Sequence, residues 1–263
     1  MQNLFTQLPS PIEVLLDPLS ITVLGFYVFL MAWESLFPAR ALPKIKHWKL
    51  RGLTFFMIFF FVATYLPLLT DPYLIEYQLF DLSQLGAIPG AIIGLMVYEL
   101  GLYAYHRTMH KFDFLWRTFH QMHHSAERLD TYGALFHSPL DAIGFTLMGS
   151  LCLALFVGIS PPSITIVLLA VNFLAFFQHA NIKTPQWLGY IVQRPESHSI
   201  HHGKNIHRNN YADIPLIDIL FGTFENPKDY QKETGFYEGA SSRVKEMLLF
   251  KDVSSPKRSD SNP

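Results

Sequence analysis

Long apolar runs separated by short polar segments form the main pattern along this sequence. We expect helices in these runs, because a helix that spans a bilayer needs about 20 mostly apolar residues. Five runs fit, at about Ser20–Phe37, Leu53–Leu69, Ala87–Tyr105, Leu140–Ile159 and Pro162–Gln178. Only Ser160-Pro161-Pro162 separates the last two, which predicts a helical hairpin. The pattern indicates an all-α, polytopic integral membrane bundle.

Charged residues between the runs predict which helix ends face the cytoplasm. The loop from Arg40 to Arg51 carries five cations and no acid, whereas residues 71–85 carry three acids and no cation. Cytoplasmic loops are enriched in Lys and Arg, so the first of these loops is predicted to be cytoplasmic. Counting spans from there also places the segments after Tyr105 and after Gln178 on the cytoplasmic side.

Histidines gather in those two segments. Eight of the 12 histidines form three clusters, His106 with His110, His120 with His123 and His124, and His198 with His201 and His202. Residues three and four apart share a helix face, so each cluster points several imidazoles in one direction. The repeated His-x-x-His-His pattern indicates metal binding, and eight ligands would saturate two ions. Imidazole suits several transition metals, so the ligands alone leave the metal open.

Composition excludes several other classes of protein and site. Only 16% of residues are charged, against about a quarter in soluble domains. The net charge is -1 and no dense basic block occurs, so no nucleic-acid partner is expected. Cys152 is the single cysteine, which excludes a disulfide framework and a thiolate metal site. No bound nucleotide or haem is expected, because the sequence lacks the corresponding glycine-rich or haem-binding segments.

Two features inside the third apolar run predict local roles. Gly86, Gly90 and Gly94 recur every fourth residue, which predicts a face for close helix packing rather than a nucleotide-binding loop. Glu99 is the only carboxylate in that run. Acids inside a membrane are rare enough to mark it for function, although its place near the helix end also fits a local pairing.

The motifs occur in a characteristic order between about Leu102 and Pro227, which is about half of the chain. They are His106-x-x-x-His110, His120-x-x-His123-His124, Gln178-His179-Ala180-Asn181, His198-x-x-His201-His202-Gly203, and Asn210-Tyr211 followed by Asp218 and Phe221-Gly222-Thr223. This set resembles the fatty acid hydroxylase/sterol desaturase superfamily. Gln178-His179-Ala180-Asn181 is similar to the alkylglycerol monooxygenase-like branch, whereas Phe136-His137-Ser138-Pro139 resembles the sterol desaturases, so the subfamily stays open.

The resemblance implies a membrane-bound oxidoreductase with a di-iron centre in a cytoplasmic histidine-rich cap. Such an enzyme uses O2 and two external electrons to hydroxylate or desaturate an unactivated C–H bond of a lipid: a sterol, a fatty acyl chain or an ether lipid. A cytochrome, ferredoxin, reductase or pterin would donate the electrons. The implied metal ligands are His106, His110, His120, His123, His124, His179, His198, His201 and His202, with His137 either a ligand or a supporting residue.

Acidic residues near the clusters are candidates for supporting the ligands. Metal-bound histidines usually donate their second N–H to a carboxylate or a carbonyl. Asp218 is the first candidate, and Glu196 and Asp141 are the next. His207 matches no motif position and is expected at the surface or facing a phosphate.

The same observations predict domain boundaries and leave two other functions to weigh. Residues 1–85 are predicted as N-terminal transmembrane helices, 86–240 as the catalytic domain with further membrane helices, and 241–263 as a disordered polar tail. A divalent-metal transporter could use His-x-x-x-His pairs, but transporters bind near the bilayer midplane, whereas these clusters follow the ends of spans. A haem protein would need only two or four histidines, spaced across the spans.

Overall fold

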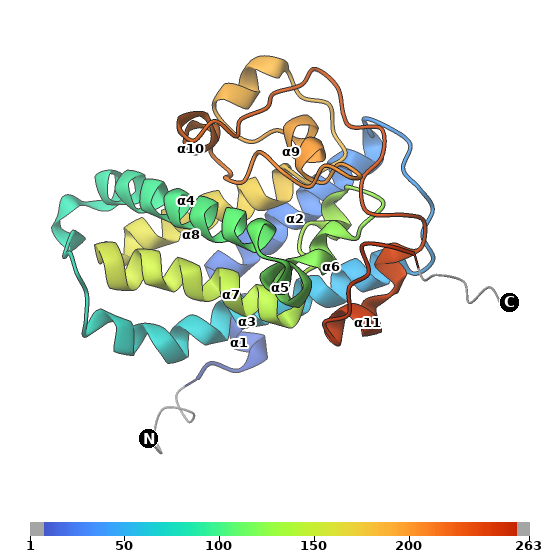
Figure 1. Ribbon diagram of the computed structural model, residues 1–263. Helices are drawn as coiled ribbons and strands as arrows, with labels where there is room; N and C mark the ends of the chain where they lie inside the picture. The colour runs from blue at the N-terminus through green and yellow to red at the C-terminus, as the bar shows by residue number, and fades with distance from the viewer. Residues whose placement is uncertain (1–7, 257–263) are drawn as a thin grey trace, which may run out of the picture.

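Five long apolar segments form the body of the protein in a computed structural model that describes residues 8–256. They are α2 (Pro18–Leu36), α3 (Trp48–Ile75), α4 (Ala87–Lys111), α7 (Pro139–Ser150) continuing into the π-helix η5 (Leu151–Val157), and α8 (Pro161–Phe177), packed side by side in Figure 1. Four are long and apolar enough to cross a membrane, and α8 is a shorter apolar helix. The prediction of an all-α bundle with several membrane helices is confirmed.

Local signals in the sequence explain where these helices begin. Asp17 accepts hydrogen bonds from the backbone N–H groups of Leu19 and Ser20, and Pro18 follows it as the first residue of α2. Ser138 accepts from the Asp141 N–H in the same way, with Pro139 as the first residue of α7. Side-chain acceptors at the N-cap satisfy free N–H groups, and proline is well tolerated at the first helical position.

Glycines allow α4 to approach the α7–α8 hairpin closely. A Cβ added at Gly90 would lie 2.5 Å from Ser163 Oγ, and one at Gly94 would lie 2.5 Å from Ile159 Cδ1. Larger residues would push these segments apart, so the predicted packing face is confirmed for Gly90 and Gly94. Gly86 has a different role, because it precedes α4 with a φ of 78° that side chains rarely adopt.

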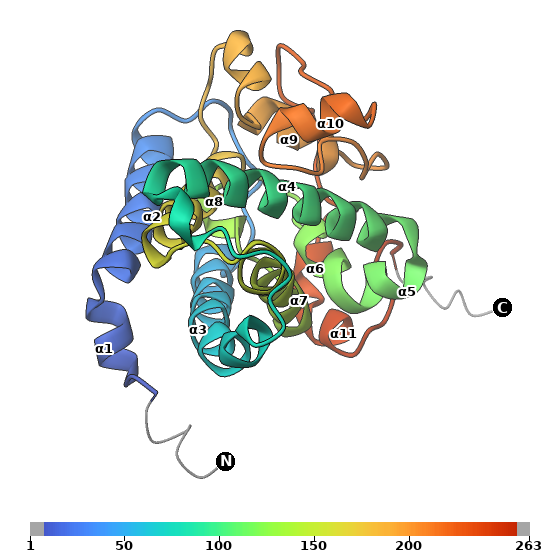
Figure 2. The ribbon, with the colours of Figure 1, turned by 90° about the vertical axis from the view of Figure 1, so that its left-hand side faces the viewer.

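The segment that contains α9 (Pro195–His201) and α10 (Pro215–Leu220) forms a layer over one side of the long helices (Figure 2). The other short elements lie before, between or after the long helices: α1 (Pro11–Leu16), η2 (Ser83–Leu85), α5 (Asp113–Leu115), η3 (Trp116–His120), α6 (Gln121–His124), η4 (Thr131–Gly133), η6 (Gln186–Tyr190), η7 (Ala240–Ser242) and α11 (Val244–Leu248). Glu99 ties this layer to α4, because its buried Oε2 accepts the backbone N–H groups of Asp213 and Ile214. Glu99 lies in the middle of α4, so the expected place near a helix end is wrong, and its partners are backbone groups more than 100 residues away in the sequence.

The prediction of a disordered tail from residue 241 onward is wrong for residues 241–256. Ser241 and Val253 are fully buried, and Met247 of α11 is almost so. Met247 and Val253 pack in the same hydrophobic cluster as Trp48, and Gln121 Oε1 accepts the Val253 N–H. Two well-separated apolar residues give no periodic pattern, which is why the sequence hid this packing. Residues 257–263 lie outside the described range, and the remaining domain boundaries stay predictions.

Candidate metal centre

Nine of the ten histidines predicted as ligands form two buried groups. Group A is His106, His110, His120, His124 and His201, and group B is His123, His179, His198 and His202. Within each group, one ring nitrogen from every histidine lies within 4.8 Å of the others. The structure thus brings together residues that are almost 100 positions apart in the sequence. The tenth, His137, lies beside His120 and Asp141.

Four separate elements position these side chains. The last two turns of α4 carry His106 and His110, and the segment η3–α6 carries His120, His123 and His124. His179 follows the end of α8, while α9 and its C-cap carry the last three histidines. The turn η3, which ends at His120, is a π-helix, a rare form that is frequent at functional sites.

Four of the five group A histidines donate a hydrogen bond from Nδ1–H to an oxygen atom of the protein. Three of them donate to backbone carbonyls: His106 to Tyr211 at 2.8 Å, His110 to His207 at 2.9 Å and His201 to Asn209 at 2.7 Å. The fourth, His120, donates to Asp141 Oδ2 at 2.9 Å. A neutral imidazole that donates from Nδ1 has a lone pair and no proton on Nε2. These four Nε2 atoms are therefore free to act as ligands.

The Nε2 atoms of group A converge on one another. His106 Nε2 lies 2.9 Å from His120 Nε2 and 3.0 Å from His201 Nε2. With the Nδ1 atoms donating, no proton is available for these contacts, so lone pairs face lone pairs. The Nε2 atoms of His110 and His124 are also buried without a partner among residues 8–256. A cation at the point of convergence would satisfy all five, which is the arrangement that a metal ion requires.

Group B converges in the same way but has fewer fixed rings. His179 Nε2 lies 3.1 Å from both His123 Nε2 and His198 Nε2, and His202 Nε2 lies 3.0 Å from His198 Nε2. The His179 Nδ1–H donates to the Ala175 carbonyl at 2.7 Å. In the described part of the chain, the Nδ1 atoms of His123, His198 and His202 are buried with no partner.

Burial keeps these imidazoles neutral. Desolvation, followed by the effect of neighbouring histidines, holds the pKa values of five of them well below the ordinary value of 6.5: His123, His124, His198, His201 and His202. Burial likewise lowers the pKa of His179 to about 3. Neutral imidazole is the form that binds metals, so at pH 7 the two groups present ligands without having to lose protons.

Asp141 supports two of the histidines directly. Its buried Oδ2 accepts the Nδ1–H of His120 at 2.9 Å and that of His137 at 2.6 Å. The His137 ring stacks on the His123 ring with centroids 4.0 Å apart. His137 therefore bridges the carboxylate and a group B histidine, which fits the supporting role that the sequence left open for it.

Asp218, the first candidate for supporting a histidine, contacts none. Its two oxygens accept the backbone N–H groups of Tyr211 and Ala212, each at 2.9 Å, and the Thr223 hydroxyl at 2.7 Å. These bonds fix the peptide whose carbonyl accepts from His106. Asp218 thus positions His106 indirectly, by fixing the Tyr211 carbonyl to which that ring is hydrogen-bonded. Spacing along the sequence does not reveal such an indirect contact.

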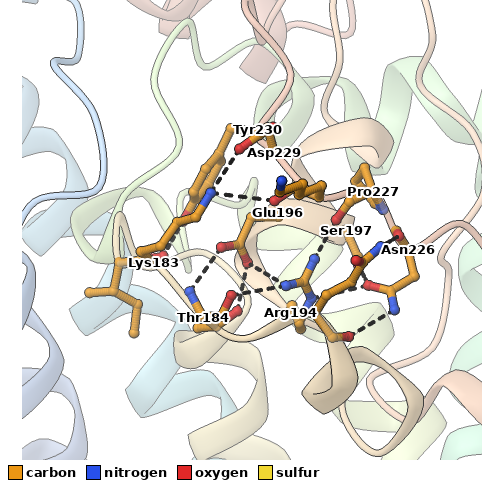
Figure 3. A network of polar contacts seen from close by, with 12 residues as sticks. Lys183, Thr184, Arg194, Glu196, Ser197, Asn226, Pro227, Asp229 and Tyr230 are labelled. Carbon is orange, nitrogen blue, oxygen red and sulfur yellow. Dashed lines mark hydrogen bonds and ion pairs between the residues drawn. The ribbon is translucent and has the colours of Figure 1, made fainter.

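Glu196 also contacts no histidine and instead anchors the start of α9 (Figure 3). Its carboxylate accepts the Thr184 N–H at 2.9 Å and the Thr184 hydroxyl at 2.6 Å, and it lies 3.7 Å from the Arg194 guanidinium. Arg194 is fully buried and donates to the carbonyls of Thr184 and Pro227. This network holds in place α9, which carries His198 and His201 and has His202 as its C-cap.

His207 is a supporting residue that sequence reasoning missed, and the surface position expected for it is wrong. It is half-buried, its Nδ1 lies 3.1 Å from His124 Nδ1, and its ring is hydrogen-bonded to the backbone of Gly235. Burial lowers the pKa of His207 to about 4, so the ring is neutral and has one N–H. With that N–H given to the Gly235 carbonyl, Nδ1 accepts from His124 and leaves His124 Nε2 unprotonated.

The loop around His207 supplies the three carbonyls that fix His106, His110 and His201. Its backbone has positive φ at Asn205, His207, Asn209 and Asn210, with values from 42° to 68°. Asparagine adopts this conformation more readily than most residues, so the Asn-rich run was the available signal. The unusual backbone turns several carbonyls of one short loop toward the histidines.

An elongated cavity of about 1060 Å³ ends at both groups. It extends from the exposed residues Glu13 and Asp17, at the N-terminal end of the bundle, to His106, His123 and His198. Apolar residues of four helices make up most of its lining, among them Phe59, Leu102, Phe145, Leu153 and Leu168. A space of this shape suits one long apolar chain that reaches the histidines with one part of its length.

The fatty acid hydroxylase family model matches residues 91–223, about half of the chain. The chain belongs to this family. Human alkylglycerol monooxygenase is 37% identical over 132 residues, which cover 48% of this chain and 28% of that protein. Ornithine lipid hydroxylase OlsE of Rhizobium tropici is 32% identical over 140 residues, 52% of this chain and 42% of that protein.

A plant protein is also similar to this chain. Sphinganine C4-monooxygenase 2 of Arabidopsis thaliana is 27% identical over 146 residues, which cover 51% of this chain and 53% of that protein. The matches thus span about half or less of the curated relatives. No solved structure matches the chain. The region shared with the family contains or borders every histidine of groups A and B.

Proposed function

We propose that this protein is a membrane-bound oxidoreductase that uses O2 to hydroxylate a lipid, with one iron ion in group A and one in group B. The observation that carries the proposal is the convergence of the Nε2 atoms within each group, several of them left unprotonated by Nδ1–H donation, at the inner end of the apolar cavity. Family membership supports it independently. Imidazole ligands alone would also accept other transition metals, so iron is the choice that the family favours.

The chain itself performs the steps of binding and positioning. The chemistry that bound iron supplies in such a site is the reductive activation of O2. One oxygen atom enters a C–H bond, the other leaves as water, and an external donor provides two electrons and two protons. The apolar wall around Leu102 and Phe145 holds the lipid chain against the histidines and excludes water. The Asp141 carboxylate, which accepts from His120, would balance the positive charge of an ion held by that histidine.

The relatives indicate the class of substrate. Their names specify an alkylglycerol, an ornithine lipid and sphinganine, all of which carry long apolar chains, and all are named as hydroxylases or monooxygenases. This favours hydroxylation over desaturation, and an acyl or ether lipid over a sterol. We place the histidine groups on the cytoplasmic side, where an external cytochrome, ferredoxin, reductase or pterin would deliver the electrons.

A divalent-metal transporter is not supported. A path for hydrated cations needs polar groups along its length, whereas most of this cavity is lined by apolar side chains. The histidines lie at one end of that cavity and not midway along it, where transporters bind their ions. The named relatives are enzymes that act on lipids.

Two measurements test the proposed function. The first is elemental analysis of full-length protein purified in detergent after expression with iron supplementation, and the expected result is close to two irons per chain. The second is incubation of membranes that contain the protein with isotopically labelled O2, followed by mass spectrometry of the lipids. A lipid should gain one labelled oxygen, and membranes with His201→Ala should not produce it. Folded protein that retains no metal and oxidises no lipid contradicts the proposal.

A further inference from the structure

Ser150 differs from the two threonines that line the cavity. Thr64 and Thr146 face the same space, and each donates its hydroxyl to the carbonyl four residues earlier in its own helix. Helical Ser and Thr usually make this bond when nothing else is available. Ser150 is only 5% exposed, and its Oγ has no partner among residues 8–256. A buried hydroxyl without a partner is costly, so this one calls for a partner that enters the cavity.

Two more polar groups with free hydrogen-bonding capacity line the cavity near Ser150. Asn172 on α8 uses one N–H for the Leu168 carbonyl, and its Oδ1 accepts no hydrogen bond from the described residues. The Tyr98 hydroxyl on α4 likewise has no hydrogen-bond partner in residues 8–256. The Tyr98 ring lies beside Gly149, where an added Cβ would be 3.1 Å from its edge. We call Tyr98, Ser150 and Asn172 the polar layer.

The polar layer lies at one level of the cavity. With a helical rise of about 1.5 Å per residue, Tyr98 lies about 12 Å from His106 along α4, and Asn172 lies about 10 Å from His179 along α8. The same rise puts Ser150 about 14 Å beyond Asp141 along α7. Three neighbouring helices therefore present unpaired polar groups at a similar distance from the histidines.

The surroundings of the polar layer select a neutral ligand group. Its cavity neighbours are apolar on both sides, with Leu102 and Phe145 toward the histidines and Leu153 and Leu168 away from them. Of the charged lining residues, Asp213 is near enough to act on Tyr98, and its carboxylate already accepts from Gln178 Nε2. A charged ligand group would lose its hydration in these mostly apolar surroundings. The free Asn172 Oδ1 needs a donor, whereas the Ser150 and Tyr98 hydroxyls can donate or accept.

We propose that the polar layer binds a neutral substrate group that both donates and accepts hydrogen bonds, an amide or a hydroxyl, in an otherwise apolar lipid chain. The position of the layer sets this group about 10–14 Å from the carbon that is oxidised at the histidines. The inference rests on the proposed function for the identity of the reacting end. It adds a second point of recognition, which fixes how deep the chain enters the cavity and so which carbon reaches the metal centre.

A binding experiment without turnover tests this inference. Full-length protein in detergent is loaded with a fluorescent alkyl chain, and matched probes of equal length compete for the cavity. The probes are N-octyl decanamide, octyl decanoate, the secondary alcohol with its hydroxyl at the same position, and the corresponding alkane. The amide or the alcohol should bind about threefold to tenfold more tightly than the ester, because the ester lacks a donor. Comparison of the amide probe with the alcohol probe shows which of the two groups the protein prefers.

Variants connect the preference to the polar layer. Ser150→Ala and Asn172→Leu should each remove most of the preference while leaving alkane binding unchanged. Thr146→Val is the matched control, since that hydroxyl already has a partner, and it should keep the preference. Ser150→Ala should also unfold at the same temperature as the wild type or a higher one, because it removes an unpaired hydroxyl.

Two outcomes overturn the inference: equal binding of all four probes by the wild type, or an unchanged preference in both Ser150→Ala and Asn172→Leu. The result is separate from the proposed function. Protein that shows the preference but never oxidises a lipid would contradict the function and leave the polar layer as a lipid-binding site. Protein that oxidises a lipid but shows no preference among the probes would support the proposed function and contradict the role of the polar layer.

Discussion

Replacing Asp141 with Asn should weaken metal binding by about 30-fold. Asp141 Oδ2 accepts two N–H donors, from His120 and His137, inside the protein. Hydrogen bonds to a charged group contribute about 2 kcal/mol and neutral ones about 1 kcal/mol. The Asn carbonyl can still accept both bonds but lacks the charge, so about 2 kcal/mol is lost in total, which corresponds to about 30-fold. This agrees with the 10–100-fold typical for partners of metal-bound histidines.

The assay is a competition for metal between purified protein and a coloured chelator, with thermal unfolding measured in parallel. Asp130→Asn is the control, because Asp130 is equally buried and accepts from Trp48 Nε1 and the Gly133 N–H but touches no histidine. The control should unfold at a lower temperature with unchanged metal affinity. Metal affinity in Asp141→Asn within about threefold of the wild type would refute the supporting role of the carboxylate.

Three further predictions follow from the site. His123→Ala and His201→Ala should each abolish lipid oxidation, with normal amounts of protein in the membrane fraction, because both lie outside the candidate spans. His207→Gln keeps an acceptor for His124 and should retain metal, whereas His207→Phe should lose about tenfold in affinity by chelator competition. Burial raises the pKa of Asp213 to about 7. The wild type therefore loses stability as pH rises from about 4 to about 7, and Asp213→Asn should show a stability advantage that grows over that range in unfolding assays.

The sequence predicted those parts of the protein that depend on periodic or local patterns. Apolar runs of the required length predicted the long helices, and histidines spaced three and four residues apart predicted the histidine clusters. Glycines at every fourth residue gave the approach of α4 to its neighbours at Gly90 and Gly94. In each case the information lies within one segment, so no knowledge of the tertiary fold is needed.

Contacts between distant segments were the part that the sequence could not supply. Spacing along the sequence does not distinguish Asp141 from Asp218 as a hydrogen-bond acceptor for a histidine, and only the folded chain shows that Asp141 is the one in contact. The loop carbonyls that accept from His106, His110 and His201 belong to the backbone, so no residue type marks them. The role of His207 depends on a left-handed backbone that brings its ring to His124.

The unequal fixing of the two histidine groups sets an order of events for the proposed pair of ions. Group A meets an arriving ion with rings already held by carbonyls, a carboxylate and His207, whereas three group B rings have no Nδ1 partner in residues 8–256. Ordering those rings reduces the free energy gained on binding. We therefore expect stepwise loading: the first equivalent of metal should occupy group A and the second group B, and a chelator should remove them in the opposite order. A form with one ion per chain should then be isolated at partial loading.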